Sequence, residues 1–293
     1  MAENGLLASI EQQDWLQPGV DRASELIKDA FESGGERGQN VKNALHGVWL
    51  GHPLHPAITD VPVGSWTVAA ALDLLEMRGD SNYRSGADFA VLLGLLSALP
   101  AAVSGATDWS DTQGKAQRVG AVHGMLNLSA AVLYAGSLAA RRAERRGIGR
   151  GLGFLGFGLV LVSAYLGGEL SYTQKIGVNH APDVEEDLPK DFTFAIAEAE
   201  LTEGKPTKVN VEGNDVLLLK TPTKLYALAN KCAHMGGPLN EGKLEGDSVV
   251  CPWHGSRFCL RDGRVEDGPA TTNQPAFDVK IEGGNVLIRA RQS

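Results

Sequence analysis

The sequence predicts two halves of different fold class, an N-terminal all-α four-helix transmembrane bundle and a C-terminal all-β domain. Two observations predict this division. Residues 46–180 carry 19 charged side chains, 10 basic and 9 acidic, whereas residues 181–293 carry 31, 13 basic and 18 acidic. The first half also contains four long apolar stretches, and the second contains short alternating runs. A single uniform soluble core is therefore not expected, although the chain of 293 residues has a net charge of −8.

The four apolar stretches are long enough to cross a lipid bilayer. They cover residues 54–77, 89–107, 119–140 and 151–168. A hydrocarbon core of about 30 Å needs roughly 20 mostly apolar residues in a helix. Four such stretches joined by short loops argue against the alternative, in which they are buried helices of a large soluble domain. Ala, Gly and Ser within the last three stretches allow close approach of membrane helices.

The composition predicts four segments along the chain. We expect an amphipathic helical N-terminal segment at 1–45, a transmembrane domain at 46–177, a linker at 178–191 and the β domain at 192–293. Residues 18–33 and 41–49 place apolar side chains on one helical face, which either the membrane surface or the other domain would cover. The linker sequence HAPDVEEDLPKD predicts an extended, solvated chain that would let the β domain move.

Short strands are expected throughout the last 100 residues. Runs such as TKVNV, DVLLLKT, KLYALAN, AFDVKI and NVLIRA alternate in polarity and are separated by Gly, Asn and Asp. The sequence EGGN near the end predicts a hairpin turn.

Two Cys/His motifs in the β half give the sharpest chemical signal. Cys232 and His234 form a C-x-H pair in KCAHMGGPL, and Cys251 and His254 form a C-x-x-H pair in CPWHGSRF. If the two loops converge, they offer two thiolates and two imidazoles, ligands that suit an iron–sulfur centre or zinc. The spacing alone leaves both kinds of site open.

The residues around these motifs resemble the Rieske family over about residues 190–293, through C-x-H with a following glycine pair and then C-P-x-H-G-S. The resemblance implies a 2Fe-2S cluster in which Cys232 and Cys251 ligate the buried iron, and His234 and His254 ligate the outer one. It also implies tight turns that bring amide donors to the bridging sulfides, and a hydroxyl bond from Ser256 to a sulfide. These supporting residues are Gly236, Gly237, Pro238, Pro252, Gly255 and Ser256.

Departures from the high-potential Rieske proteins of quinol-oxidising complexes imply a ferredoxin-like cluster. Gly237 and Trp253 stand where those proteins carry a disulfide, and Phe258 stands where they tend to have a hydrogen-bonding tyrosine. With fewer hydrogen bonds to the sulfurs, we expect a reduction potential in the lower part of the range of roughly −150 to +300 mV. Cys259 is expected to be a small buried side chain.

The chain after His254 contains no histidine, so we expect no mononuclear iron site of the Rieske oxygenases downstream of the cluster. No nucleophile–base pair or nucleotide-binding glycine loop is evident either. The sequence therefore predicts an electron-transfer component of an oxidoreductase system rather than a stand-alone catalyst.

The membrane half resembles a family of predicted four-helix bacterial membrane domains of unknown function, through HPLHP at residues 52–56 and the following Asp60. That resemblance brings no established chemistry. Ionisable residues at membrane depth are costly and point to function. His55 and His123 predict the two axial ligands of a haem b, or a quinone pocket in which one of them accepts a proton together with Asp60. The structural alternative is that His55 caps a helix or anchors at the membrane interface, and that Asp60 or Asn127 satisfies His123 inside the bundle.

Four crossings return the chain to the side where it began, so both termini are expected on one side of the bacterial inner or plasma membrane. The loop RRAERRGIGR holds five arginines, and the positive-inside rule then puts the termini and the cluster outside the cytoplasm. Residues 145–150 also loosely resemble a twin-arginine export signal, with topogenic arginines as the alternative.

These features together predict a membrane-anchored one-electron carrier. It would exchange electrons with a redox partner protein or a quinone at the exposed edge formed by His234 and His254. Two alternatives stay open: a two-cofactor membrane oxidoreductase with haem or quinone in the bundle, and a redox or iron–sulfur sensor. A net-acidic chain whose basic residues are not massed on one face is a poor nucleic-acid binder.

Overall fold

The computed structural model describes residues 9–291, and the chain divides into two compact units. Unit 1 contains residues 9–38 together with Leu54–Ile176. Unit 2 contains Gln39–Pro53, which we call the strap, and residues 177–291. Unit 1 is helical and unit 2 is built of strands, as the sequence predicts. The predicted boundary after residue 45, however, falls inside the strap, which belongs as a whole to unit 2.

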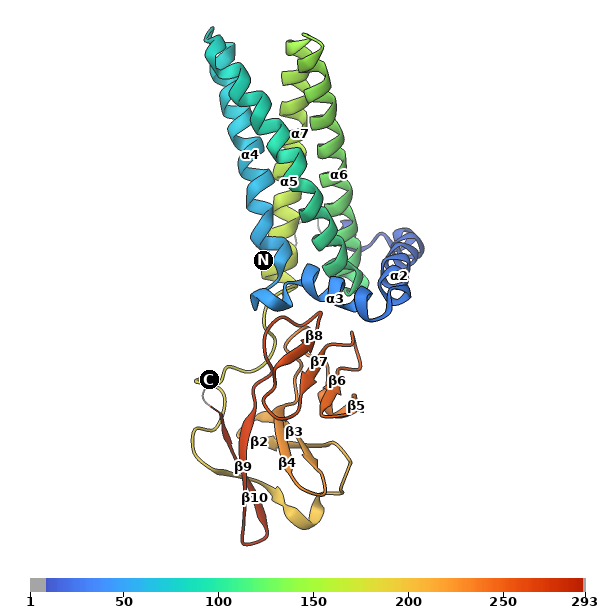
Figure 1. Cartoon of the computed structure of the whole chain (residues 1–293), viewed down its shortest axis with the longest axis vertical. Helices are drawn as coiled ribbons and strands as arrows, with labels where there is room; N and C mark the ends of the chain where they lie inside the picture. Colours follow the sequence, from blue (N-terminus) through green and yellow to red (C-terminus); the bar gives the residue numbers. More distant parts are fainter. Residues whose placement is uncertain (1–8, 292–293) are drawn as a thin grey trace. The chain divides into compact units, whose positions relative to one another are not determined.

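Four long helices run side by side in unit 1 (Figure 1). They are α4 (Leu54–Met77), α5 (Arg84–Ser110), α6 (Gly114–Arg142) and α7 (Arg146–Gly168), and a short π-helix (Glu169–Thr173) continues the last one. Each of the four is long and apolar enough to cross a membrane. Helix α4 has the bounds of its predicted span. The other three extend beyond their apolar stretches, because their end turns carry charged side chains that pair within the unit.

The amphipathic helix α2 (Gln17–Ser33) packs on the long helices of its own unit. Val20 and Ser24 are buried, and the Ser24 hydroxyl donates to the Ser110 carbonyl of α5 at 2.8 Å. Leu26, which the sequence places on the same apolar face, is exposed. The covered stripe is therefore narrower than the predicted face.

Buried ion pairs tie the four helices together at one end of unit 1. Arg141 of α6 donates to both carboxylate oxygens of Asp73 on α4 and, at 3.0 Å, to Asp88 on α5. Arg146 of α7 donates to both oxygens of Glu76, at 2.7 and 2.6 Å, and to Asp88 at 2.9 Å. Leaving one such buried charge without its partner costs about 3–5 kcal/mol. Two arginines of the predicted topogenic loop are thus structural residues of the bundle.

Unit 2 contains three small antiparallel sheets within the described chain. The first has the order β1-β10-β9 and is formed by β1 (Thr193–Ala197), β10 (Asn285–Ala290) and β9 (Phe277–Glu282). The second is formed by β2 (Thr207–Val211), β3 (Asn214–Lys220) and β4 (Leu225–Ala229). The third is formed by β5 (Lys243–Glu245), β6 (Ser248–Val250), β7 (Arg257–Cys259) and β8 (Val265–Asp267). The predicted EGGN hairpin is confirmed as the turn between β9 and β10.

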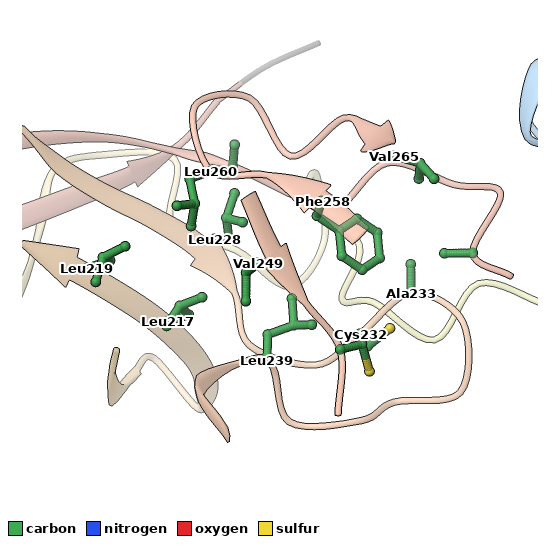
Figure 2. Packing of buried hydrophobic residues seen from close by; sticks show 13 residues of the cluster. Leu217, Leu219, Leu228, Cys232, Ala233, Leu239, Val249, Phe258, Leu260 and Val265 are labelled. Atoms are coloured by element: carbon green, nitrogen blue, oxygen red, sulfur yellow. The ribbon is translucent and has the colours of Figure 1, made fainter. Parts of the chain in front are cut away.

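Two hydrophobic clusters hold these sheets together. One contains Leu218, Phe277 and Ile288 from the first two sheets. The other lies under the third sheet and includes both motif cysteines together with Leu239 and Phe258. Figure 2 shows Leu217 and Leu219 at one end of this second cluster and Cys232 and Ala233 at the other. The apolar core therefore reaches to the base of the Cys/His loops.

The strap is held to unit 2 by side-chain contacts of α3 (Gly35–His46), whose last eight residues lie in the strap. The Asn43 amide donates to the Asp267 carboxylate at 2.8 Å and accepts the Gly268 N–H at 2.9 Å. His46 is buried beside Gly268, and Val48 packs on the cluster that contains the motif cysteines. Of the two coverings that the sequence left open for residues 41–49, the β unit is the one observed, through partners more than 200 residues away in the chain.

Residues 178–191 pack on unit 2 rather than forming the solvated linker that their composition predicts. Leu188 is buried in the core cluster, and Ala181 and Val184 pack against the two clusters. The Pro189 carbonyl accepts the Ala290 N–H at 2.7 Å. The segment is therefore part of the β unit, because its few apolar side chains outweigh its acidic composition.

Replacing Leu188 with Ala should lower the free energy of unfolding of unit 2 by about 2–4 kcal/mol, because a buried leucine leaves a cavity when truncated. Denaturant unfolding of the full chain in detergent measures this, and Leu26→Ala, at an exposed leucine, is the control. Equal midpoints for the two variants would mean that residues 178–191 are a solvated tether after all.

Replacing Arg146 with Lys should lower the thermal stability of unit 1, because the single lysine nitrogen cannot replace the Nε that bonds Glu76 and the Nη1 that bonds Asp88 at the same time. Arg145→Lys, at an exposed side chain, should leave the melting temperature unchanged. If residues 145–150 are instead an export signal, Arg145→Lys and Arg146→Lys should both keep residues 192–293 inside the cell. Protease added to intact cells would then fail to cleave these residues in either variant.

Candidate metal centre

The two Cys/His motifs lie on loops with the same backbone pattern. The first loop follows β4, and the second joins β6 to β7. Each cysteine N–H donates to the carbonyl five residues later, Cys232 to Gly237 at 2.9 Å and Cys251 to Ser256 at 2.8 Å. Each of these bonds lies next to an antiparallel backbone pair. Lys231 pairs with Pro238 beside the first loop, and Val250 pairs with Arg257 beside the second.

A glycine closes each loop four residues after its cysteine. The Gly236 N–H donates to the Cys232 carbonyl at 2.8 Å, and the Gly255 N–H donates to the Cys251 carbonyl at 3.1 Å. Both glycines have φ of +78°, a left-handed conformation that costs side chains free energy. The resemblance to the Rieske family assigned tight turns to these two glycines, and their backbone conformation agrees with that role.

The loops sort the four motif side chains into two pairs. The thiols of Cys232 and Cys251 are buried and hydrogen-bonded to each other. The imidazole rings of His234 and His254 are half-buried, with centroids 5.0 Å apart and planes at 90°. Across residues 9–291, no three His, Cys, Asp or Glu side chains gather as a site for one metal ion. Two adjacent thiols beside two adjacent imidazoles suit a pair of metal atoms with two protein ligands each.

Backbone N–H groups point at both sulfur atoms. The N–H groups of His234 and Met235 donate to Cys232, and those of Trp253 and His254 donate to Cys251. The bond between the thiols raises the pKa of Cys232 and lowers that of Cys251 to about 7. The pair thus shares a proton that a metal would displace, since thiolates are the ligating form.

Gly237 lies so close to the Cys251 sulfur that a side chain at this position would clash with it. A Cβ atom there would lie 2.8 Å from the Cys251 Sγ and 3.1 Å from the Trp253 ring. Gly237 and Trp253 therefore face each other, at the two positions where the resemblance places the disulfide of high-potential relatives. The Trp253 side chain is 54% exposed beside His254, and Pro252 is exposed between it and Cys251.

Buried residues pack against the second loop on its core side. Ser256 is fully buried, and its hydroxyl oxygen accepts the Ala270 N–H at 2.9 Å, which leaves the hydroxyl proton to donate elsewhere. Phe258 is fully buried in the cluster under the loops. Cys259 is buried on the same strand, as expected for a small apolar side chain.

Gln274 is a site residue that sequence reasoning missed. Its side chain is 1% exposed and accepts the Ala233 N–H at 3.0 Å. Its amide donates to the carbonyls of Ala229 and Lys231, both at 2.7 Å. It thus fixes the first loop on both sides of Cys232. No motif marks it, because its partners lie more than 40 residues earlier in the chain.

The two histidines of unit 1 that the sequence singled out face each other. The rings of His55 on α4 and His123 on α6 have centroids 6.3 Å apart, with planes at 89°. Each Nδ1 donates to a backbone carbonyl of a neighbouring helix at 2.8 Å. The Asn127 amide donates to His123 Nε2 at 3.1 Å, whereas Asp60 is exposed. Of the two structural partners considered for His123, Asn127 is the one in contact.

A small all-β unit with paired thiols and imidazoles on two loops is suited to hold an iron–sulfur cluster of an electron-transfer protein. Family comparison agrees, since residues 191–278 match the Rieske [2Fe-2S] domain. The chain belongs to the Rieske [2Fe-2S] family. Residues 51–180 match a second family, described as Predicted membrane protein (DUF2231), so both resemblances that the sequence suggested are confirmed.

Individual relatives share the β unit's family. The chain is 38% identical over 101 residues to the naphthalene 1,2-dioxygenase system ferredoxin component of Pseudomonas aeruginosa, covering 34% of this chain and 97% of that protein. It is 41% identical over 91 residues to apoptosis-inducing factor 3 of Mus musculus, but covers only 15% of that protein. The solved ferredoxin of carbazole 1,9a-dioxygenase from Nocardioides aromaticivorans IC177 is 26% identical, with a TM-score of 0.33, over 35% of this chain and all of that one.

Replacing Gln274 with Leu should lower retention of bound iron and acid-labile sulfide in the purified protein. The change leaves two buried carbonyls and one N–H without their partner, at about 1–3 kcal/mol for each group. Iron and sulfide assays per chain measure the loss. Gln274→Glu, which keeps the acceptor for Ala233 but not the donors, should fall between Leu and the native residue. Full retention in both variants would show that Gln274 does not hold the loop.

Proposed function

We propose that this chain is a membrane-anchored one-electron carrier with a Rieske 2Fe-2S cluster. In this proposal Cys232 and Cys251 hold the inner iron, and His234 and His254 hold the outer one. The observation that carries it is the sorting of the four donors into a buried thiol pair and a half-exposed imidazole pair on matching loops. The bound cluster supplies one-electron oxidation and reduction near the protein surface.

The residues around the ligands hold and tune that site. The four N–H groups aimed at the cysteine sulfurs favour added negative charge there. The Ser256 hydroxyl accepts one hydrogen bond and still has its proton to donate to a sulfide. The missing side chain at Gly237 leaves space beside the Cys251 sulfur. The supporting set in the proposal is Gly236, Gly237, Pro252, Gly255 and Ser256.

The expected reduction potential is in the lower part of the Rieske range. Hydrogen bonds to sulfur raise the potential because they stabilise the reduced cluster. Phe258 offers no hydroxyl, and Gly237 and Trp253 form no disulfide. This is the pattern of a ferredoxin-like carrier, and several relatives are named as ferredoxin components of dioxygenase systems.

The membrane anchor is proposed from the large apolar side chains that unit 1 exposes. Its interior contains ion pairs, whereas large apolar side chains point outward from all four helices. Contact of such an apolar surface with lipid is favourable, whereas its contact with water costs free energy. The exposed apolar residues include Val61, Val68, Leu74, Phe89, Leu96, Leu99, Leu128, Val132, Leu155 and Leu161.

The sidedness also belongs to the proposal. Four spans put both ends of the chain on one membrane side, and the arginines between α6 and α7 favour the cytoplasm for the opposite end. Unit 2 would then work outside the cytoplasm. Its redox partner is a protein or a quinone that meets the edge of His234 and His254 beside the exposed Trp253.

Low-temperature electron paramagnetic resonance on reduced membranes, with iron and sulfide assays, tests the cluster. We expect two irons and two sulfides per chain. Either His234→Cys or His254→Cys should move the potential toward the value of about −400 mV typical of all-cysteine clusters. Cys259→Ala is the matched control and should keep both the spectrum and the potential, because Cys259 is not a proposed ligand. A single zinc and no acid-labile sulfide would end the electron-carrier proposal.

A further inference from the structure

Two segments of unit 2 lie outside residues 191–278, which match the Rieske domain, yet both contact residues that form or support the candidate metal centre. One is the strap, and the other is residues 177–181. In the chain, α4 follows the strap directly, and residues 177–181 come soon after the π-helix that continues α7. The two Cys/His loops are therefore held in part by segments that adjoin the apolar helices in sequence.

Residues 177–181 hold the first loop. The Ala233 carbonyl, between the cysteine and the histidine of the C-x-H motif, accepts the His180 N–H at 2.9 Å. The Ala233 N–H donates to the Gln274 Oε1 at 3.0 Å, so both backbone polar groups of this residue are satisfied. Ala181 packs on the hydrophobic cluster that contains the motif cysteines. The first loop is thus fixed from two sides.

The strap holds residues 267–270, a segment that begins at the last residue of β8. The Asn43 Oδ1 accepts the Gly268 N–H at 2.9 Å, and the Asn43 amide donates to the Asp267 carboxylate at 2.8 Å. A Cβ atom at Gly268 would lie 3.2 Å from the Val48 Cγ2, so the strap lies directly against the backbone at this point. Both polar and apolar contacts of the strap therefore converge on residues 267–270.

Residues 267–270 in turn support the second loop at Ser256. Asp267 pairs with Arg257, the residue after Ser256, across β8 and β7. The Ala270 N–H donates to the Ser256 hydroxyl oxygen at 2.9 Å. A hydroxyl group that accepts one hydrogen bond is polarised and becomes a stronger donor of its own proton. The strap is therefore connected to the Ser256 hydroxyl through one short segment.

We propose that the strap raises the reduction potential of the 2Fe-2S cluster, with Asn43 as a positioning residue that acts through residues 267–270 on the Ser256 hydroxyl. The inference rests on the proposed function, in which this hydroxyl donates to a sulfide of the cluster. Reduction adds negative charge to the cluster, so such a hydrogen bond is stronger in the reduced state and raises the potential. Without the strap, the hydroxyl is no longer held in line and the potential falls.

The effect is reciprocal by thermodynamic linkage. If packing of the strap favours the reduced cluster by some factor, reduction favours packing of the strap by the same factor. The strap contains the end of α3 and stops directly before α4. The oxidation state of the cluster therefore changes how firmly the segment that leads into α4 is held.

Redox titration of the full chain purified in detergent, followed by electron paramagnetic resonance, tests the inference. Asn43→Ala should keep the spectrum of the cluster but shift its reduction equilibrium roughly three- to tenfold toward the oxidised form. For one electron this is about 30–60 mV, as expected for the loss of one hydrogen bond. Thr221→Ala is the matched control. It removes two hydrogen bonds in the turn between β3 and β4, at the start of the strand that leads to Cys232, and should leave the potential unchanged.

An exchange of hydrogen-bond donor and acceptor separates positioning from charge. Asn43→Asp alone places a second carboxylate against Asp267 and should also lower the potential. Adding Asp267→Asn restores the pair, because the new carboxylate accepts both the Gly268 N–H and the new amide. The double variant has the net charge of the native protein and should regain the native potential.

Amide hydrogen exchange gives a readout that does not depend on electron transfer. Peptides that cover residues 265–270 should exchange faster in Asn43→Ala than in the native protein. In the native protein they should exchange more slowly when the cluster is reduced than when it is oxidised, because reduction favours packing of the strap. Equal exchange in the two oxidation states would overturn the inference.

Asn43→Ala with two irons and two sulfides per chain and the native potential would also overturn it. If that variant loses its cluster, the double variant decides. Recovery of both the cluster and the potential supports the inference, and a loss as large as in Asn43→Ala overturns it. Zinc without acid-labile sulfide in the native protein would instead end the proposed function, so the two failures are distinguishable.

Discussion

The backbone hydrogen bonds that close each loop around its cysteine are the constraint on which the candidate metal centre depends. The same two bonds recur in both loops, and a glycine at φ +78° makes each of them possible. Because the loops fold alike and face each other, like side chains meet across them, thiol with thiol and imidazole with imidazole. The chemistry follows from this pairing, since thiols at the core and imidazoles at the surface favour different metal atoms of one cluster.

Unit 1 is arranged differently, with buried ion pairs beside an apolar core that includes Trp66 and Tyr134. Its charges lie between the helices, where Arg141 and Arg146 meet three carboxylates, and its apolar side chains face outward. An unpaired charge buried between these helices would be very costly, so the ion pairs also fix which helices are neighbours. Trp66 and Tyr134 stack on each other and are 68 residues apart in the chain, the same separation as in the Asp73–Arg141 ion pair.

Local composition was a poor guide where a segment packs on distant parts of the chain. The acidic, proline-containing stretch 178–191 reads as a solvated linker, yet Leu188 lies in a core. The predicted boundary after residue 45 falls inside the strap, and of the two coverings left open for residues 41–49 the β unit is the one observed, since Asn43 bonds Asp267 and Gly268. Both findings have one cause. Burial of a few side chains decides where a segment lies, and the partners are not its sequence neighbours.

The sequence by itself determined the two fold classes, the four apolar spans and the donor types of the candidate cluster site, because these follow from local composition, periodicity and motif spacing. Only the tertiary structure decided that the donors form two separate pairs and that Gln274 holds the first loop. It also decided that His55 and His123 face each other with their Nδ1 atoms anchored. These features join residues far apart in the chain, and a one-dimensional pattern does not record such contacts.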